Sequence, residues 1–199
     1  MSQLLYIHGF LSSPLSYKAQ SMGQWLQQAA PDIHYHCPQL TPYPDECASD
    51  LCRQVELALE RQQMVYLVGS SMGGFWATWL AETYDLPAVL INPAVDVMGL
   101  MPKYLNQTLH NYHTDDTYCL YEKHLLQLSR YQVPVSRHKN YWLLVQMGDE
   151  TLDYRLAVKR YQGARQTVES GGDHGFQSFS RHHQAVIDFF RCFKGGSIK

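Results

Sequence analysis

A serine in residues 69–73, Gly-Ser-Ser-Met-Gly, has the spacing of the nucleophile in a G-x-S-x-G motif. The motif follows an apolar run at 64–68 and precedes a helix-forming stretch. It therefore predicts a sharp turn from strand to helix, with glycines where a Cβ would clash with backbone. We expect Ser71 at the helix N-terminus, where the dipole and free N–H groups stabilise developing negative charge. The Met72 N–H would then be one oxyanion donor.

A serine hydroxyl is a weak nucleophile until a base takes its proton and a carboxylate orients that base. Among the 10 histidines, His174 is the best placed, because it lies in a glycine-rich loop between the last expected strand and the final expected helix. Asp149 follows Gly148 at the carboxyl end of the strand expected over 141–147. Ser71, Asp149 and His174 thus occur in the chain order nucleophile, acid, base.

The identity of the acid has alternatives within the same stretch. A wider spacing after Gly148 would select Asp153, whereas the residues that follow Asp149 match the usual acid with an apolar run behind it. Asp96, after the fourth expected strand, is a third candidate. We take Asp149 as the acid, and single Asn substitutions distinguish it from Asp153.

The loop after the first strand is expected to supply the second oxyanion donor. That strand ends in His8-Gly9-Phe10, and the Phe10 N–H is the candidate. His8 is expected to make a structural hydrogen bond near this loop rather than to act as a base. Because the carboxyl ends of parallel strands share one edge of a sheet, these groups should converge there.

Structural roles alone are the competing interpretation of these residues. Ser71 could serve only as a helix N-cap, and His174 could be a loop histidine without a role. Neither explains the flanking glycines together with a downstream acid and histidine. The glycines of 69–74 also lack the G-K-[ST] of a phosphate loop.

Short apolar runs alternate with longer amphipathic stretches, a pattern typical of βαβ units. Strands are predicted at 4–8, 33–37, 64–69, 88–92, 141–147 and 166–169, and their continuous apolar character indicates a parallel sheet buried on both faces. Helices are predicted from a cap at Ser12-Ser13-Pro14 to Pro31, and over 45–62, 75–84, 154–161 and 179–193.

One segment, at about 93–140, is too long for a plain crossover between two strands. Helical spacing over 117–131 predicts a small helical cap inserted there, and an ordinary crossover helix with ragged flanks is the alternative. The segment is rich in Tyr, His, Asn and Gln.

Composition limits the function classes. The 199 residues suit one domain, and 45% hydrophobic with 17% charged residues exclude a disordered or collagen-like chain. A net charge of −2 gives no electrostatic footprint for nucleic acid or an anionic membrane. No apolar stretch approaches the roughly 18 residues of a membrane span, and the N-terminus lacks the basic residues of a secretory signal. Five cysteines without CxxC spacing predict neither a disulfide framework nor a zinc site, so a cytoplasmic location is expected.

Together these motifs resemble the α/β-hydrolases, and more closely the small bacterial esterases of the YqiA type. The resemblance spans nearly the whole chain. It depends on HGF at 8–10 with SSP at 12–14, PQL and PYP within 38–44, the glycine-rich motif at 69–74, NPAV at 92–95, residues 148–155, and the two glycines at 171–172 before His174.

The resemblance implies a single α/β-hydrolase domain over 1–199, with a parallel six-stranded sheet in the order 2-1-3-4-5-6 and helices on both faces. It also implies hydrolysis of carboxylic esters, with acyl thioesters as a related class, through an acyl-enzyme intermediate and without a cofactor or metal. A non-catalytic module that binds a small ligand or a protein on a hydrolase fold is the alternative. The natural substrate, its acyl-chain length and the oligomeric state stay open.

Overall fold

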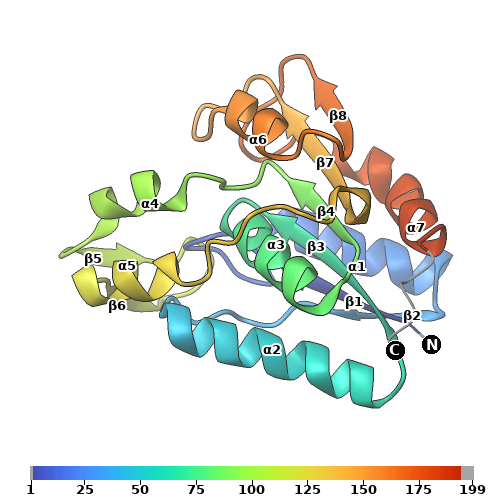
Figure 1. The fold of residues 1–199 in the computed structure, drawn as a ribbon, viewed down its shortest axis with the longest axis horizontal. Helices are drawn as coiled ribbons and strands as arrows, with labels where there is room; N and C mark the ends of the chain where they lie inside the picture. The colour runs from blue at the N-terminus through green and yellow to red at the C-terminus, as the bar shows by residue number, and fades with distance from the viewer. Residues whose placement is uncertain (1, 194–199) are drawn as a thin grey trace.

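A six-stranded parallel sheet forms the centre of the fold (Figure 1). The computed structural model describes residues 2–193. The strands are β1 (Ser2–Ile7), β2 (Ile33–His36), β3 (Met64–Ser70), β4 (Ala88–Ile91), β7 (Tyr141–Gln146) and β8 (Arg165–Glu169), in the spatial order β2-β1-β3-β4-β7-β8. Counted within this sheet alone, the order is the expected 2-1-3-4-5-6, because β5 and β6 lie in a separate hairpin. The predicted strands and topology are therefore confirmed.

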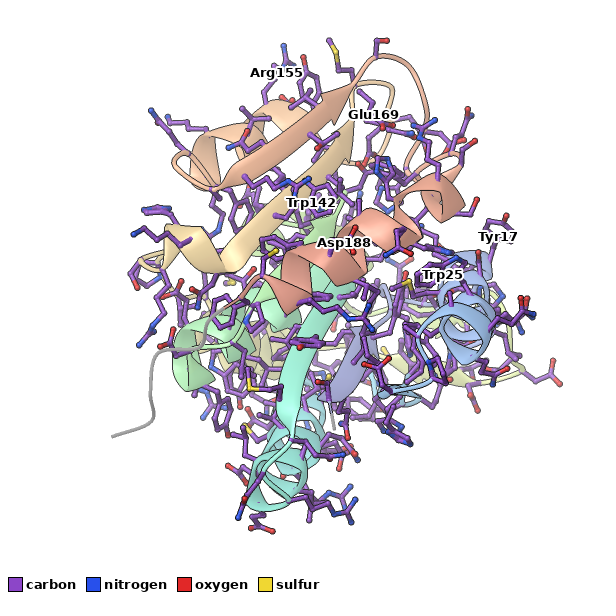
Figure 2. The ribbon with its side chains drawn as sticks, turned by 90° about the vertical axis from the view of Figure 1, so that its right-hand side faces the viewer. Tyr17, Trp25, Trp142, Arg155, Glu169 and Asp188 are labelled. Carbon is purple, nitrogen blue, oxygen red and sulfur yellow. The ribbon has the colours of Figure 1, made fainter. Side chains whose placement is uncertain are left out.

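Both faces of the sheet are covered because successive strand residues point to opposite sides. Leu5 and Ile7 belong to one buried cluster, which packs beneath α2 (Pro44–Glu60), α3 (Met72–Tyr84) and α6 (Tyr154–Arg160). Leu4 and Tyr6 belong to the other, beneath α1 (Tyr17–Ala29) and α7 (His183–Arg191). Figure 2 looks onto this second face, where α7 crosses in front of the sheet. No helix within residues 2–193 combines the length and apolar character needed to cross a membrane.

The first helix begins later than the sequence predicted. A cap at Ser12-Ser13-Pro14 was expected, but α1 starts at Tyr17. The hydroxyl of Ser13 instead accepts a hydrogen bond from the Leu15 N–H (3.0 Å), and its carbonyl accepts one from Ser16 (3.1 Å). These residues thus form a turn of their own, as serine hydroxyls often do, before the helix begins.

Two other boundaries also differ from the predicted ones. Helix α3 starts at Met72, three residues before the expected start, because it begins directly after the turn at Ser71. The last helix is divided into a 3₁₀ turn, η3 (Phe179–His182), and α7. Neither difference moves an element to another layer of the fold.

The inserted segment at 93–140 contains the expected helix and also a hairpin that the sequence did not predict. Helix α5 (Glu122–Ser129) lies within the predicted 117–131, whereas β6 (Thr117–Cys119) pairs antiparallel with β5 (Thr108–His110). The remaining elements are α4 (Val97–Leu100), η1 (Met101–Tyr104) and η2 (His138–Asn140). The hairpin is tied to the loop after β1, because the Tyr112 N–H donates to the Leu11 carbonyl at 2.8 Å.

Candidate active site

Ser71 lies at the turn between β3 and α3 in a strained conformation, with φ 55° and ψ −121°. A non-glycine residue adopts such angles only where surrounding contacts hold it. Its N–H donates to the Ile91 carbonyl at 3.0 Å, and its own carbonyl accepts from Gly74 and Ala94, both at 2.9 Å. The turn expected from the sequence is therefore present, and it directs the Ser71 side chain out of the regular strand.

The flanking glycines permit this tight turn. A Cβ on Gly73 would overlap the Ile7 carbonyl oxygen, and one on Gly69 would overlap the carbonyl of Gly73. Without these side chains, the N-terminus of α3 packs directly against the end of β1. A Cβ on Gly9 would lie 3.3 Å from the Ser71 Cβ, so the loop after β1 runs beside the serine.

His174 bridges Ser71 and Asp149, and each of the three residues lies in a separate loop. Its Nε2 lies 3.0 Å from the Ser71 Oγ, and its Nδ1 lies 3.0 and 2.9 Å from the two carboxylate oxygens of Asp149. The Asp149 side chain is 1% exposed and that of His174 is 26% exposed. The buried carboxylate favours the imidazole tautomer with its proton on Nδ1, which leaves Nε2 free to accept the serine proton.

The three candidate acids occupy different environments. Asp149 also accepts hydrogen bonds from the N–H groups of Thr151 (2.9 Å) and Leu152 (2.8 Å), which fix its orientation toward His174. Asp153 instead caps α6 and forms a bidentate pair with the exposed Arg155. Asp96 caps α4. Of the three, the structure places Asp149 against His174.

The Phe10 and Met72 amides are available as hydrogen-bond donors. Met72 is the first residue of α3, so its N–H has no partner within the helix. Within residues 2–193, neither amide donates to another backbone group. Both residues line one cavity with Gly9. The two expected donors therefore line the same cavity, with Met72 at the positive end of the α3 dipole.

His8 fixes the peptide that carries the Phe10 amide. Its Nδ1 donates to the Gly9 carbonyl at 2.9 Å, and its Nε2 accepts from the Leu40 N–H at 3.2 Å. Because the Gly9 carbonyl and the Phe10 N–H belong to one peptide plane, this bond sets the direction of the N–H. His8 is 3% exposed, and burial lowers its pKa.

Two buried amides that sequence reasoning did not single out for the site hold the loop of His174. Asn92 donates from Nδ2 to the carbonyls of Asp173 (3.0 Å) and His174 (3.2 Å), and its Oδ1 accepts from the Gln146 N–H (3.0 Å). The Gln146 side chain accepts from Asp173 (3.3 Å) and Gln177 (2.8 Å). Polar residues at the ends of apolar strands were the signal in the sequence.

Charged groups also flank this loop. The Lys18 Nζ donates to the Gly175 carbonyl at 2.6 Å. Burial lowers the pKa of Lys18 to about 8, against the opposing attraction of Asp173 and Asp149. Glu150 accepts a hydrogen bond from the backbone N–H of His174 at 3.0 Å.

Within residues 2–193, no group of three or more His, Cys, Asp or Glu side chains is placed to hold a metal ion.

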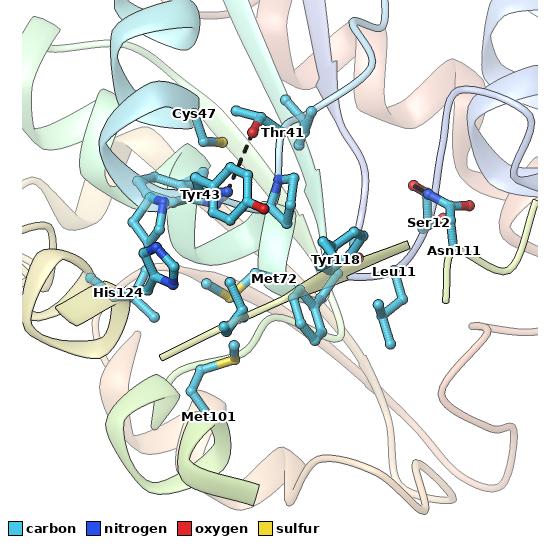
Figure 3. A pocket seen from close by; sticks show the side chains of 18 of the residues that line it. Leu11, Ser12, Thr41, Tyr43, Cys47, Met72, Met101, Asn111, Tyr118 and His124 are labelled. Atoms are coloured by element: carbon cyan, nitrogen blue, oxygen red, sulfur yellow. Dashed lines mark hydrogen bonds between the residues drawn. The ribbon is translucent and has the colours of Figure 1, made fainter. Parts of the chain in front are cut away.

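A cavity of about 450 Å³ opens beside the two candidate oxyanion amides (Figure 3). This volume lies within the range of pockets that bind small molecules. Its wall is formed by the loop after β1, the 39–44 loop with the start of α2, the start of α3, the η1 turn, the β5–β6 hairpin and α5. In Figure 3, Met72 lies between His124 at one end of the pocket and Ser12 with Asn111 at the other.

Comparison with known proteins finds one fold shared by several hydrolases. A model of the uncharacterised protein family UPF0227 matches residues 3–191. The structure of Est1E from Butyrivibrio proteoclasticus superposes with a TM-score of 0.72 at 14% identity, over 94% of this chain and 86% of that one. The esterase domain of a Rhodothermus marinus protein gives 0.70 at 15%, over 96% and 86%. Mouse alpha/beta hydrolase domain-containing protein 10 gives 0.65 at 18%, over 94% and 87%. At these identities the likeness shows the α/β-hydrolase fold.

Proposed function

The chain belongs to the uncharacterised protein family UPF0227, and from the geometry of its site we propose that it is a serine hydrolase that cleaves carboxylic esters. The observation that carries the proposal is the hydrogen-bonded line from the Ser71 Oγ through His174 to Asp149. Hydroxyl, imidazole and buried carboxylate in this order are the arrangement by which a serine becomes a nucleophile.

The geometry supports the following reaction. His174 Nε2 takes the hydroxyl proton while the Ser71 Oγ attacks the ester carbonyl carbon, and the resulting oxyanion accepts hydrogen bonds from Phe10 and Met72. His174 then gives the proton to the departing alcohol oxygen, leaving an acyl-enzyme on Ser71. In the second half, His174 takes a proton from water while the water oxygen attacks the acyl carbon, and it then gives that proton to the departing Ser71 Oγ as the acid is released. Asp149 holds the imidazole and stabilises its protonated form throughout.

Esters are the substrate class that the surroundings of the site favour. The pocket beside the oxyanion amides is lined largely by aliphatic and aromatic side chains, which suit an uncharged acyl or alcohol chain. One of the similar structures, from Rhodothermus marinus, carries the name esterase domain. Acyl thioesters would react through the same steps, so they belong to the proposal as a second class. A purely binding role explains the pocket but leaves the strained Ser71 turn without a purpose.

Covalent labelling tests the nucleophile directly. A fluorophosphonate should phosphonylate the folded protein, with a bond formed from the Ser71 Oγ to phosphorus as fluoride leaves. Peptide mass spectrometry should place the adduct on Ser71. Ser71→Ala should remain unlabelled, whereas Ser70→Ala, altered at the neighbouring serine, should be labelled like the wild type. Labelling of Ser71→Ala to the wild-type extent, or no labelling of the wild type, would overturn the proposal.

A further inference from the structure

We propose that the pocket beside Ser71 recognises a neutral hydrogen-bond-accepting oxygen on the substrate chain through the Nε2–H of His124. This inference rests on the proposed esterase function and names the substrate class: esters with a second oxygen, as a ketone, ether or hydroxyl, several bonds from the reacting carbonyl.

His124 lies on α5, in the wall of the cavity that also contains the two oxyanion amides (Figure 3). It is 7% exposed. Its ring packs against those of Tyr43 and Tyr121, with centroids 5.1 and 5.9 Å away. Because the ring packs against these two tyrosines, only part of its edge is open to the cavity.

The chain sets the tautomer of His124. Its Nδ1 accepts a hydrogen bond from the Tyr121 N–H at 3.0 Å, so Nδ1 carries no proton. Burial lowers the pKa of the ring, and Lys123 lowers it further against the attraction of Glu46 and Asp45. A neutral imidazole with a bare Nδ1 carries its proton on Nε2. His124 therefore offers one N–H donor.

That donor has no partner among the described residues. No acceptor within residues 2–193 forms a hydrogen bond with the His124 Nε2. This nitrogen is also not sealed from solvent, in contrast to the buried Nε2 of His183. Because the residue is otherwise buried and lines the cavity, the cavity is where the donor is reached. A donor in a cavity wall that has no partner within the chain is free to bond to an acceptor of a ligand that enters the cavity.

Two other polar side chains of the pocket, Thr41 and Asn111, are bonded within the chain. Thr41 Oγ1 accepts from the Tyr43 N–H (3.4 Å) and donates to Glu46 (3.1 Å). The Asn111 side chain donates to the Ser12 carbonyl (2.9 Å) and accepts from the His113 N–H (2.8 Å). These groups maintain the loops of the pocket, whereas His124 is available to the substrate.

The charge of the pocket selects a neutral acceptor. Among the described residues that line the cavity, none is Lys or Arg, and the acids Asp50 and Asp116 lie at its wall. Asp50 is paired with Arg53 at 2.7 Å, whereas Asp116 forms no ion pair among the described residues, so a carboxylate or phosphate would meet the Asp116 charge without a cation in the pocket wall. A ketone, ether or hydroxyl oxygen accepts from a neutral N–H without that cost.

The inference is tested with esters that carry one additional oxygen at a different position in each compound. Two ester series of constant chain length are used: p-nitrophenyl oxoalkanoates, which vary the acyl part, and acetates of oxo-alcohols, which vary the alcohol part. Each kcat/KM is compared with that of the plain chain, after division by the hydroxide-catalysed rate of the same ester. At one position we expect the oxygen to raise the corrected kcat/KM about 2- to 13-fold over that of the plain chain, the effect of one hydrogen bond.

Two variants at His124 separate the donor from the structural bond. Asn at 124 keeps an oxygen that accepts from the Tyr121 N–H but has no donor at the Nε2 position. In His124→Asn, the corrected kcat/KM of the oxygen-bearing ester should therefore equal that of the plain ester. His124→Gln places an amide N–H near that position and should retain part of the preference. His110→Asn, at an exposed histidine of β5, serves as the matched control and should keep the wild-type ratio.

Two results would overturn the inference: a wild type with no preference at any position, or a preference that persists in His124→Asn. The wild-type series alone decides the first, so the test does not depend on the folding of a variant. Turnover of the plain esters without a preference removes this inference and leaves the esterase proposal intact. No turnover of any ester would remove both.

Discussion

Asn92 should control the position of His174, the proposed base, and Asn92→Ala tests this. The side chain is 3% exposed and joins the end of β4 to the carbonyls of Asp173 and His174 and to the Gln146 N–H. Alanine removes all three hydrogen bonds at once. The two loop carbonyls can turn toward water, but the Gln146 N–H is buried and is left without its acceptor.

The magnitude follows from these contacts. An unsatisfied buried donor costs about 1–3 kcal/mol, and the lost loop bonds add about 1 kcal/mol, so we expect the free energy of unfolding to fall by about 2–4 kcal/mol. The His174 Nε2 lies 3.0 Å from the Ser71 Oγ, and a misplacement of about 1 Å can cost on the order of 10² in rate. We therefore expect kcat to fall about 10- to 100-fold. KM should change little, because Asn92 is not among the residues that line the substrate pocket.

Urea unfolding and steady-state ester hydrolysis at 20 °C measure the two effects. Asn92 has φ 40°, so Asn92→Gly removes the same bonds without backbone strain and should lose kcat equally. Asn140→Ala is the matched control, since Asn140 is 7% exposed and donates to Asp85 (2.9 Å) and Leu86 (3.3 Å) far from the site. It should lose stability but keep kcat. Wild-type kcat in folded Asn92→Ala, or an equal kcat loss in Asn140→Ala, would refute the reasoning.

Three further predictions concern the acid, the oxyanion loop and acid stability. Asp149→Asn should lower kcat on the order of 10⁴-fold while Asp153→Asn stays near wild type, and the reverse pattern in ester kinetics would reassign the acid. His8→Leu, which frees the Gly9–Phe10 peptide, should lower kcat about 10-fold, and His8→Asn should recover part of it because its amide reaches the same carbonyl; equal kinetics for the two variants would contradict this role. Burial lowers the pKa of His183 to about 4, whereas the unfolded chain takes that proton near 6.5. Stability is thus full above pH 6.5 and declines toward pH 4, and His183→Phe should flatten this decline in urea unfolding; an unchanged pH slope would exclude His183 as its source.

The sheet could be predicted from the sequence because parallel strands buried on both faces read as continuous apolar runs. The hairpin β5–β6 could not, since three-residue strands carry too little pattern to separate from helical spacing. The start of α1 was placed too early because the Ser13 hydroxyl makes a turn instead of a cap.

Local motifs located the candidate site better than they located its supports. Ser71 and His174 stand in glycine-rich loops whose spacing is visible in the chain. Asn92 acts through bonds to residues 81 and 82 positions away, and such contacts follow from packing and leave no local pattern. His124 likewise appeared only as part of a helical stretch, because the cavity it faces is assembled from segments far apart in the sequence, from residue 8 to residue 128.

The most direct test of the proposed chemistry is hydrolysis of p-nitrophenyl butyrate by the wild type, Ser71→Ala and Ser70→Ala under identical conditions. The wild type and Ser70→Ala should turn the ester over, and Ser71→Ala should lose on the order of 10⁶ in kcat, as expected when a nucleophile is removed. Equal rates in the wild type and Ser71→Ala would contradict the account, because the hydroxyl held against His174 would then take no part in the reaction.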